Sequence, residues 1–334
     1  MVFLSLLRSS SNVFKQEISD LNHVARNLIS LKSSGNDTFL ANCLLPGRMS
    51  LKAIYGGQYV ALQLRAACMT VSEGMLPHST HSYFLQSGTV EAPITVNIKK
   101  VRDGQSFCNR YMETVQKGRS EERLLCSGVT SFHVDEPPAV RHLKPFKPYV
   151  DPESLLTWED GIKDGLNDPN ITPFHRKLLE WKLKNTPRLF SRIFDIRTTD
   201  VPRWTMRTRH PPDVAPEHQG FIKCNFSPGD GQVDHRVMAS FMGDIVMMEG
   251  ALVDHINHGF FPTMLFSIDQ SVYFHTDINV NEWMFFDVQS PVADNGRIFA
   301  ECKVWSLDGR LLMTNTQEGL VRYDQSHPNS QAPT

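Results

Sequence analysis

The sequence predicts an α+β protein made of two similar units, each with one helix packed against an antiparallel sheet. Three observations support this prediction: the size of the chain, an internal repeat of strand patterns, and a proline-rich segment between the two copies. The chain has 334 residues, of which 40% are hydrophobic. That is enough material for two units of ordinary domain size, each with its own core.

The repeat is clearest in the strands that follow two Tyr-Phe pairs. In the first half, Tyr83-Phe84 precedes an alternation of apolar and polar residues from Ile94 to Lys99. In the second half, Tyr273-Phe274 precedes a similar alternation from Met284 to Gln289. A period of two is typical of strands. Each copy continues with a second alternating strand, a turn and a final strand, so the order of elements is the same in both halves.

A helix is predicted ahead of the strands in each half. Its apolar stripe is formed by Val60, Leu64, Ala67 and Val71 in the first half and by Val237, Phe241, Ile245 and Met248 in the second. Residues at this spacing share one face of a helix, which can be buried on the inner face of a sheet. One long helix across a curved antiparallel sheet is the hotdog arrangement, so the predicted fold is a double hotdog.

Prolines separate the two predicted units. Five of them lie between Asp135 and Pro152 and interrupt both periodicities, which is typical of a linker. A short amphipathic helix is expected at 175–183, and strand and loop at 195–216. The expected organisation is an N-terminal extension (1–23), a first hotdog unit (24–134), a linker with a helical insertion (135–190), a second unit (191–324) and a C-terminal tail (325–334).

Charge and composition narrow the classes of partner. The chain has 34 basic and 36 acidic side chains, for a net charge of -2. No nucleic acid partner is therefore expected, and a small molecule is. The six cysteines include no Cys-x-x-Cys pair and are expected to be reduced core residues of an intracellular protein. The sequence contains no apolar run long enough for a membrane span, so a soluble protein is expected.

Two pairs of histidines could in principle bind a metal. His78 and His81, like His255 and His258, are three residues apart, which on a helix could place two ligands on one face. Neither pair has an evident third ligand nearby, so structural histidines are the favoured interpretation. No metal and no other cofactor is predicted.

Asp244 falls on the apolar face of the second predicted helix, between Phe241 and Met248. A carboxylate there would point inward, and its burial is costly unless hydrogen bonds offset it. The residue is therefore either functional or placed inward by a wrong helix register. Ser267 and Gln317 are polar residues on otherwise apolar strands, and each alone is better explained as an ordinary structural or solvated side chain. The absence of a Gly-x-Ser-x-Gly elbow argues against an acyl-serine α/β-hydrolase.

Several motifs occur together and in order: Tyr55-Gly56-Gly57-Gln58, His81-Ser82-Tyr83-Phe84-Leu85, Arg102-Asp103-Gly104-Gln105-Ser106-Phe107, Asn281-Glu282-Trp283 and Gln317-Glu318-Gly319-Leu320-Val321-Arg322. With these motifs the chain resembles, from about Val24 to Tyr323, the family of bacterial thioesterase II and peroxisomal acyl-CoA thioesterase 8. The resemblance also implies a double hotdog. It implies hydrolysis of fatty acyl-CoA to free fatty acid and CoA.

In that family an aspartate, a hydroxyl residue and a glutamine hold the attacking water, and Asp244, Ser267 and Gln317 occupy the matching positions. The resemblance implies that Asp244 is the base and that the other two orient the water. Gln270 and Tyr273 stand where family members often have histidine and tryptophan, which leaves the acyl-chain preference open.

Backbone N–H groups at the start of the first helix, around Gly56, Gly57 and Gln58, are candidates for binding the thioester carbonyl. One alternative is a non-catalytic acyl-CoA-binding protein of the same fold. Another is a hotdog hydratase, which would need an Asp/His pair on the helix. His235 is nine residues from Asp244 and does not share its face.

The resemblance further implies a homodimer or a dimer of dimers, and a peroxisomal location. The chain ends in Ala332-Pro333-Thr334, which is not a Ser-Lys-Leu-type signal. Met1 to Gln16 contains basic residues and serines without acidic ones, which mildly resembles a mitochondrial presequence. Mitochondrion and cytosol are therefore the alternatives to the peroxisome.

Overall fold

The computed structural model describes residues 21–47, 50–118, 121–144, 146, 148–186, 188–211 and 214–323. The chain forms two compact units, and each is assembled from segments that are distant in sequence. The first unit comprises Met1–Asp135, Pro187–Ile193 and Asn225–Phe241. The second unit comprises Glu136–Thr186, Phe194–Cys224 and Met242–Thr334.

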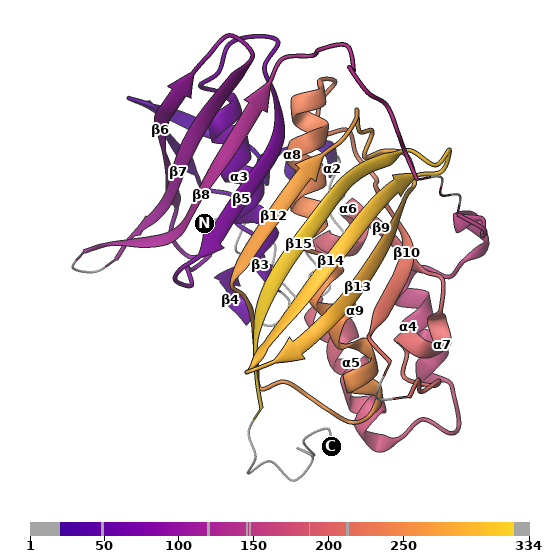
Figure 1. The fold of residues 1–334 in the computed structure, drawn as a ribbon. Helices are drawn as coiled ribbons and strands as arrows, with labels where there is room; N and C mark the ends of the chain where they lie inside the picture. Colours follow the sequence, from indigo (N-terminus) through magenta and orange to yellow (C-terminus); the bar gives the residue numbers. More distant parts are fainter. Residues whose placement is uncertain are drawn as a thin grey trace. The chain divides into compact units, whose positions relative to one another are not determined.

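The first unit is an antiparallel sheet with one helix across it (Figure 1). Its strands are β1 (Lys32–Gly35), β2 (Thr38–Ala41), β5 (Leu76–Phe84), β6 (Ile94–Asp103), β7 (Phe107–Lys117) and β8 (Glu122–His133). They are hydrogen-bonded in the order β1-β2-β6-β7-β8-β5. Helix α3 (Gly56–Cys68) contacts β2, β5, β6, β7 and β8. The shorter elements are α2 (Leu21–Asn27), β3 (Pro46–Gly47), β4 (Ser50–Ile54) and α6 (Arg188–Ile193).

The core of the first unit lies between α3 and the sheet. Val60, Leu64 and Ala67 are fully buried, which confirms the predicted apolar stripe. Val71 was expected to extend the stripe, but α3 ends at Cys68 and Val71 packs against the core from beyond the helix. The predicted alternation at the start of β6 is also confirmed, since the side chains from Ile94 to Ile98 alternate between buried and half-buried.

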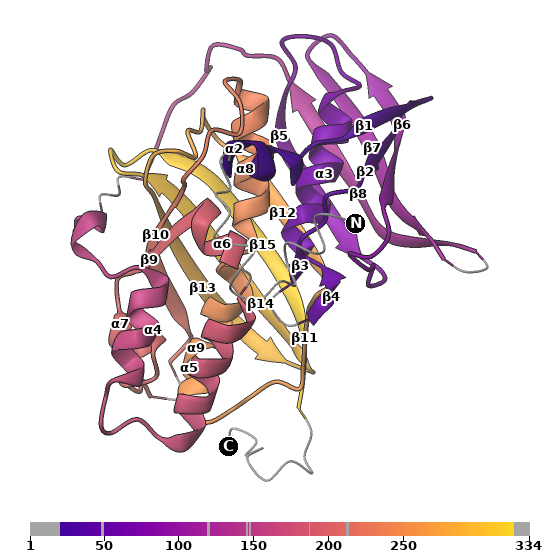
Figure 2. The same ribbon diagram turned by 180° about the vertical axis from the view of Figure 1, so that it is seen from behind.

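The second unit repeats this layout with additional helices. Its strands are β9 (Phe194–Thr198), β10 (Glu217–Cys224), β11 (Met264–Ser267), β12 (Asp269–Phe274), β13 (Met284–Asp294), β14 (Arg297–Ser306) and β15 (Leu311–Arg322). The order is β12-β15-β14-β13-β10-β9, and β11 pairs with β15. The helices are α4 (Trp158–Leu166), α5 (Pro173–Asn185), α7 (Val201–Trp204) and α9 (Met247–Asn257), with a 3-10 turn, η1 (Pro152–Ser154). Helix α9 contacts β10, β13, β14 and β15, and Figure 2 shows it on the same side of the sheet as α4 and α5.

The predictions for this half are largely confirmed. The expected strand at 284–289 lies in β13, and the short helix expected at 175–183 lies within α5. The segment 195–216 contains β9 and also the short helix α7, which was not predicted. Pro202 occupies an early position of α7 and Asp200 caps it, so the helix follows from local residues.

The single helix predicted through Val237, Phe241, Ile245 and Met248 is wrong. Helix α8 (Gln232–Gly243) ends at Gly243, and α9 begins at Met247. Glycine and aspartate have low helix propensity, and so do the β-branched residues that follow. Tertiary packing also requires the glycine, because a β carbon at Gly243 would lie 2.3 Å from Nδ2 of Asn315 on β15. Asp244 therefore lies in a break between two helices.

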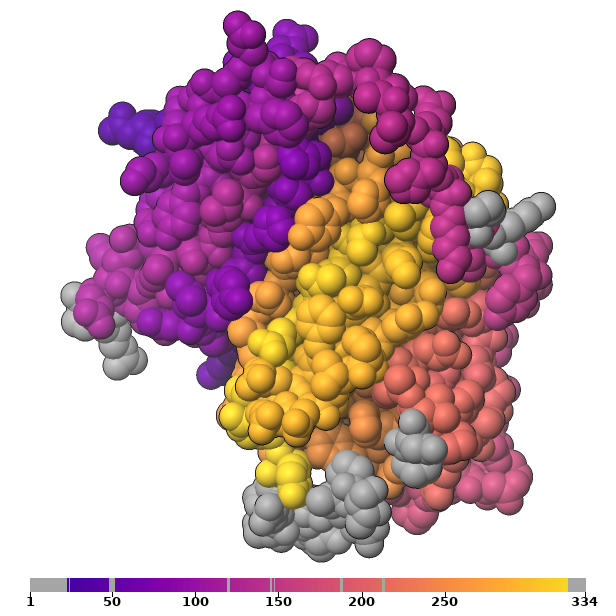
Figure 3. Space-filling model, viewed as in Figure 1, coloured from indigo at the N-terminus to yellow at the C-terminus, as the bar shows by residue number. Residues whose placement is uncertain are grey.

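The predicted linker has no helix or strand in its described part between β8 and η1, and one of its side chains packs against the sheet of the second unit. Phe146 packs against Phe285 and Trp305, with ring centroids 5.0 Å apart in each case. In the space-filling view the magenta linker lies against the yellow and orange surface of this sheet (Figure 3).

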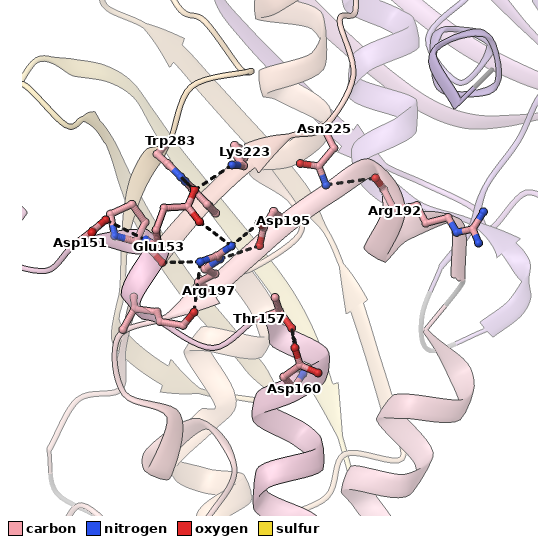
Figure 4. A network of polar contacts seen from close by, with 12 residues as sticks. Asp151, Glu153, Thr157, Asp160, Arg192, Asp195, Arg197, Lys223, Asn225 and Trp283 are labelled. Carbon is pink, nitrogen blue, oxygen red and sulfur yellow. Dashed lines mark hydrogen bonds and ion pairs between the residues drawn. The ribbon is translucent and has the colours of Figure 1, made fainter. Parts of the chain in front are cut away.

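The end of the linker is held by a polar network centred on Glu153 (Figure 4). The carboxylate of Glu153 accepts hydrogen bonds from Trp283 Nε1 at 2.9 Å and from Lys223 Nζ at 3.3 Å. Arg197 pairs with the same carboxylate at 3.1 Å and donates to the carbonyl of Pro152 at 2.9 Å. The guanidinium of Arg197 and the ammonium of Lys223 also lie over the Trp283 ring. These contacts connect the linker to β9, β10 and the start of β13.

Candidate active site

The three residues singled out by the sequence all lie in the second unit, two on strands and one between helices. Asp244 follows the last residue of α8. Ser267 is the last residue of β11, and Gln317 lies in β15. Strands β11 and β15 are paired so that Ser267 lies opposite Gly319. Gln317 is two residues before Gly319, and positions two residues apart share a face of a strand, so Gln317 lies on the same face of β15 as Gly319.

One carboxamide joins the three side chains. Nε2 of Gln317 donates to Oδ1 of Asp244 at 2.6 Å and to Oγ of Ser267 at 2.6 Å. Gln317 is fully buried, and Asp244 and Ser267 are half-buried. The structure therefore brings together the three predicted residues, although they are separated by up to 73 positions in the sequence.

Neighbouring backbone contacts fix the two strand residues of this group. The N–H of Glu318 donates to Oδ1 of Asp269 at 2.7 Å, and the N–H of Ile268 donates to the carbonyl of Glu318 at 2.7 Å. Gly319 is required for close packing, because a β carbon there would lie 2.4 Å from Sδ of Met248 in the first turn of α9. The positions of Ser267, Gln317 and the start of α9 therefore depend on one another.

The arrangement suits the binding and activation of a water molecule. Both N–H groups of the Gln317 carboxamide are occupied, which directs them toward Asp244 and Ser267. Ser267 accepts one of these bonds through Oγ and keeps its own O–H as a donor. A carboxylate accepts several hydrogen bonds and can take a proton. A water near these groups could donate to Asp244 and accept from Ser267.

The start of α3 has a different character. Tyr55 is the N-cap residue, without a side-chain capping bond, and Gly56 is the first residue of the helix. Oε1 of Gln58 accepts from the N–H of Leu45 at 2.7 Å, and Nε2 donates to the carbonyls of Leu28 and Cys43, each at 2.8 Å. The buried side chain of Gln58 therefore holds neighbouring loops. A role of this segment in binding stays a prediction, and it would depend on backbone groups of Gly56 and Gly57.

The two histidine pairs differ in local structure, and one histidine of each pair is hydrogen-bonded within the chain. His78 and His81 lie on β5 rather than on a helix, and His78 shares a 2.8 Å hydrogen bond with Ser131. His258 shares a 2.7 Å hydrogen bond with the carbonyl of His210, and His255 lies in the last turn of α9. Within the described residues, no three His, Cys, Asp or Glu side chains form a group that could hold a metal ion.

The cysteines have no role that the structure supports. All six are free, and four of them are buried. Burial raises the pKa of Cys68, Cys126 and Cys302 to about 12. A thiol with so high a pKa is a poor nucleophile at neutral pH.

In the part of the chain that is described, no helix has the length and apolar character of a membrane span.

Sequence reasoning missed Asn315, which lies two residues before Gln317 on β15. Both are fully buried, while the intervening Thr316 is half-buried. A visible signal was present in Thr314-Asn315-Thr316-Gln317, because polar residues occupy every position of this stretch, including those expected to face the core.

Comparisons with known proteins agree with this architecture. Residues 45–133 match the family model described as the acyl-CoA thioesterase N-terminal domain, and residues 169–321 match the acyl-CoA thioesterase C-terminal domain. The human acyl-coenzyme A thioesterase 8 is 28% identical over 278 residues, which cover 81% of each chain. Acyl-CoA thioesterase 2 of Haemophilus influenzae is 26% identical over 279 residues, covering 83% of this chain and 90% of that protein.

Solved structures show the same fold. The crystal structure of acyl-CoA thioesterase II TesB2 from Mycobacterium marinum matches with a TM-score of 0.69 at 22% identity, covering 90% of this chain and 99% of that one. A protein of unknown function with a hot dog fold from Alicyclobacillus acidocaldarius matches with a TM-score of 0.64 at 14% identity, covering 89% and 97%. The α+β hotdog fold predicted from the sequence is thereby confirmed.

Proposed function

The chain belongs to the acyl-CoA thioesterase family, and we propose that it hydrolyses fatty acyl-CoA to free fatty acid and CoA with a water held by Asp244, Ser267 and Gln317. The observation that carries this proposal is the pair of 2.6 Å hydrogen bonds from one Gln317 nitrogen to Asp244 and Ser267. A shared donor of this kind fixes the carboxylate and the hydroxyl around one position.

In the proposed reaction, the oxygen of the bound water attacks the thioester carbonyl carbon as Asp244 takes a proton from the water. The carbonyl oxygen becomes an oxyanion in a tetrahedral intermediate. The intermediate collapses, the carbon–sulfur bond breaks, and the protonated Asp244 returns the proton to the departing CoA sulfur. The products are the acid and CoA thiol, and the aspartate ends in its original ionisation state.

Ser267 and Gln317 would act before the chemical step. The hydroxyl of Ser267 donates to the water, and Gln317 keeps the orientations of Asp244 and Ser267 compatible. Holding the water in attack geometry removes part of the entropic cost of a reaction in which it would otherwise diffuse freely.

The same geometry disfavours Ser267 as a nucleophile. Oγ of Ser267 accepts a hydrogen bond from Gln317, whereas an attacking serine needs a base to accept its proton. Attack by water also leaves no acyl group on the protein. The non-catalytic acyl-CoA-binding alternative is disfavoured because it would not need an ionisable group beside a hydroxyl.

The hydratase alternative finds no support in the helix geometry. His235 is near the start of α8 and Asp244 follows its last residue. Nine residues of α-helix span about 13 Å, so the two side chains do not form an acid–base pair.

We also propose that Gly56, Gly57 and Gln58 contribute to acyl-CoA binding through backbone N–H groups at the start of α3, which could bind the thioester carbonyl. A homodimer or dimer of dimers is proposed on the family resemblance, and light scattering at micromolar concentration tests it.

A peroxisomal location is proposed because a yeast relative, 20% identical over 327 residues, is named peroxisomal acyl-coenzyme A thioester hydrolase 1. The signals considered at residues 1–16 and 332–334 lie outside the described residues. Imaging the full chain with a C-terminal tag, beside a version that starts at Asn22, tests the location. A mitochondrial signal that disappears in the shorter version would contradict it.

The experiment for the function combines an assay with mass spectrometry. The purified chain is supplied with a panel of saturated acyl-CoA esters and free CoA is measured, and turnover is then quenched and the intact protein is weighed. We expect CoA release without an acyl adduct. A stoichiometric adduct on Ser267 or on any cysteine would replace the water mechanism with a covalent one.

A further inference from the structure

Asn315 has an unusual environment in the core of the second unit. Its side chain is fully buried, and neither Nδ2 nor Oδ1 has a hydrogen-bond partner within the described part of the chain. Met313, two residues before it on the same face of β15, is also buried. A buried polar atom left without a partner destabilises the folded chain. Leucine, which has nearly the same shape, would fill the position without that cost.

The carboxamide of Asn315 lies immediately beside the proposed catalytic group. A β carbon at Gly243 would be 2.3 Å from Nδ2 of Asn315 and 3.3 Å from Nε2 of Gln270. Both carboxamides therefore lie against the residue that directly precedes Asp244. Gln270 is on β12, which pairs with β15 so that Ser271 lies opposite Thr316. The uncharged amide groups of Asn315 and Gln270 thus lie where α8 ends, beside the trio formed by Asp244, Ser267 and Gln317.

A second buried acceptor lies on the same face. Oε1 of Gln317 also has no hydrogen-bond partner among the described residues, because both bonds of this side chain are made through Nε2. The groups without a partner are therefore the two N–H donors of Asn315 and the side-chain carbonyl oxygens of Asn315 and Gln317, within the described residues. A ligand that satisfies them must both donate and accept hydrogen bonds, and an uncharged group fits best because it avoids burying a second charge beside the Asp244 carboxylate.

We propose that Asn315 determines substrate specificity by hydrogen-bonding a hydroxyl group on the acyl chain close to the thioester carbonyl, so that 3-hydroxyacyl-CoA is preferred over the unsubstituted ester. This inference rests on the proposed function. A hydroxyl supplies one donor and one acceptor, which matches a carboxamide. A plain methylene chain supplies neither and leaves both atoms of Asn315 without partners.

The spacing along the strand is compatible with this role. Asn315 and Gln317 are two residues apart, which is about 6.6–6.8 Å along a strand. An oxygen on C3 is separated from the attacked carbon C1 by two carbon–carbon bonds and one carbon–oxygen bond, and its hydrogen-bond partner lies about 2.8 Å further. Asn315 is one inward-facing position from Gln317, which orients the water in the proposed reaction, so we expect a hydroxyl close to the thioester carbonyl to be the substrate group that reaches it.

The test compares kcat/KM for 3-hydroxydecanoyl-CoA and decanoyl-CoA. We expect the unmodified chain to prefer the hydroxylated ester by about 10-fold or more, as follows from satisfying one or two buried polar atoms. Asn315→Leu should reduce the ratio to about 1 or below, with a lower value for the hydroxylated ester and an equal or higher value for the plain one. Thr316→Val is the matched control, because it removes a polar group from the adjacent, outward-facing position.

The outcomes separate this proposal from the proposed function. An unchanged ratio in Asn315→Leu, or an equal loss on both esters in a variant with normal thermal unfolding, would overturn the role of Asn315. If Asp244→Asn retains full activity on both esters, the proposed function fails whatever the ratio is. Should Asn315→Leu not fold, Asn315→Ala provides the same comparison with a smaller side chain.

Discussion

Where the second unit carries Gln317, the first unit carries Thr130. The correspondence follows from strand register, since Tyr83 pairs with Ser127 on β8 as Tyr273 pairs with Thr314 on β15. Ser127 is three residues before Thr130, and Thr314 is three residues before Gln317. The same hotdog scaffold therefore presents a hydroxyl in one unit and a carboxamide in the other.

The neighbouring positions differ even more. Ala300 lies opposite Gln317 on β14, whereas the corresponding pair in the first unit is Arg110 opposite Thr130. Arg110 is 2% exposed, and its guanidinium donates to Asp103 at 2.6 Å and to Oγ1 of Thr70 at 2.9 Å. The residue opposite Gln317 is therefore small and uncharged, whereas the residue opposite Thr130 is a large buried cation.

At the register position of Ser267, the first unit has a residue without a hydroxyl. In the second unit, Ser267 lies opposite Gly319, which is two residues after Gln317. In the first unit, the equivalent position is two residues after Thr130, at Phe132, and the residue opposite Phe132 is Pro77. Proline has neither a side-chain hydroxyl nor a backbone donor. The comparison teaches that one unit uses this region for packing, and it supports a single proposed catalytic group per chain.

The largest expected effect is that of Asp244→Asn. Loss of a positioned base should lower turnover by a factor on the order of 10² or more, with the fold intact. Steady-state release of CoA measures this, and circular dichroism checks folding. Glu301→Gln, an exposed acid-to-amide change on β14, is the control and should retain full activity. Near-normal turnover of Asp244→Asn would remove this residue from the mechanism.

Ser267→Ala and Gln317→Ala should each lower turnover by about 10-fold, less than the loss of the base. The double variant should lose less than the product of the two single effects, because both side chains orient one water. Thr130→Ala, the counterpart of Gln317→Ala in the first unit, should leave kcat unchanged. A strictly multiplicative double variant would contradict the shared water.

Arg110→Ala should affect stability rather than chemistry. The variant loses the packing of a fully buried side chain and at least two side-chain hydrogen bonds, so the free energy of unfolding should fall by about 2 kcal/mol. Chemical denaturation of both proteins gives this difference. A loss of kcat at temperatures where the variant is folded would show that the first unit takes part in the reaction.

Acid is also expected to change stability, through a buried histidine of the second unit. Burial lowers the pKa of His218 to about 4, with Glu249 opposing the shift and Lys182 and Arg203 adding to it. The unfolded chain binds this proton near the ordinary value of 6.5, so it binds more protons than the folded chain between about pH 6.5 and 4. Stability should therefore decrease as pH falls through this range.

Thermal unfolding from pH 7 to pH 4 tests this effect. His218→Phe should flatten the dependence, because phenylalanine cannot be protonated. An unchanged slope in His218→Phe would assign the acid sensitivity to other histidines whose pKa values desolvation also lowers, such as the buried His175 and the half-buried His255.

The sequence alone determined the repeat, the strand alternation and the identity of the trio. These features are local or follow from order along the chain: the period-two patterns of β6 and β13 and the stripe of α3 are set by residues within one element. The positions of Asp244, Ser267 and Gln317 came from motif order, which needs no coordinates.

Tertiary structure decided the features that depend on contacts between distant residues. The break at Asp244 depends on Asn315 packing against Gly243, which no helical periodicity reveals. The hydrogen bonds of Gln317, the burial of Arg110 and the internal role of Gln58 likewise join residues from separate elements. A pattern of polarity gives the face of a side chain, but its partner is fixed only when strands and helices pack together.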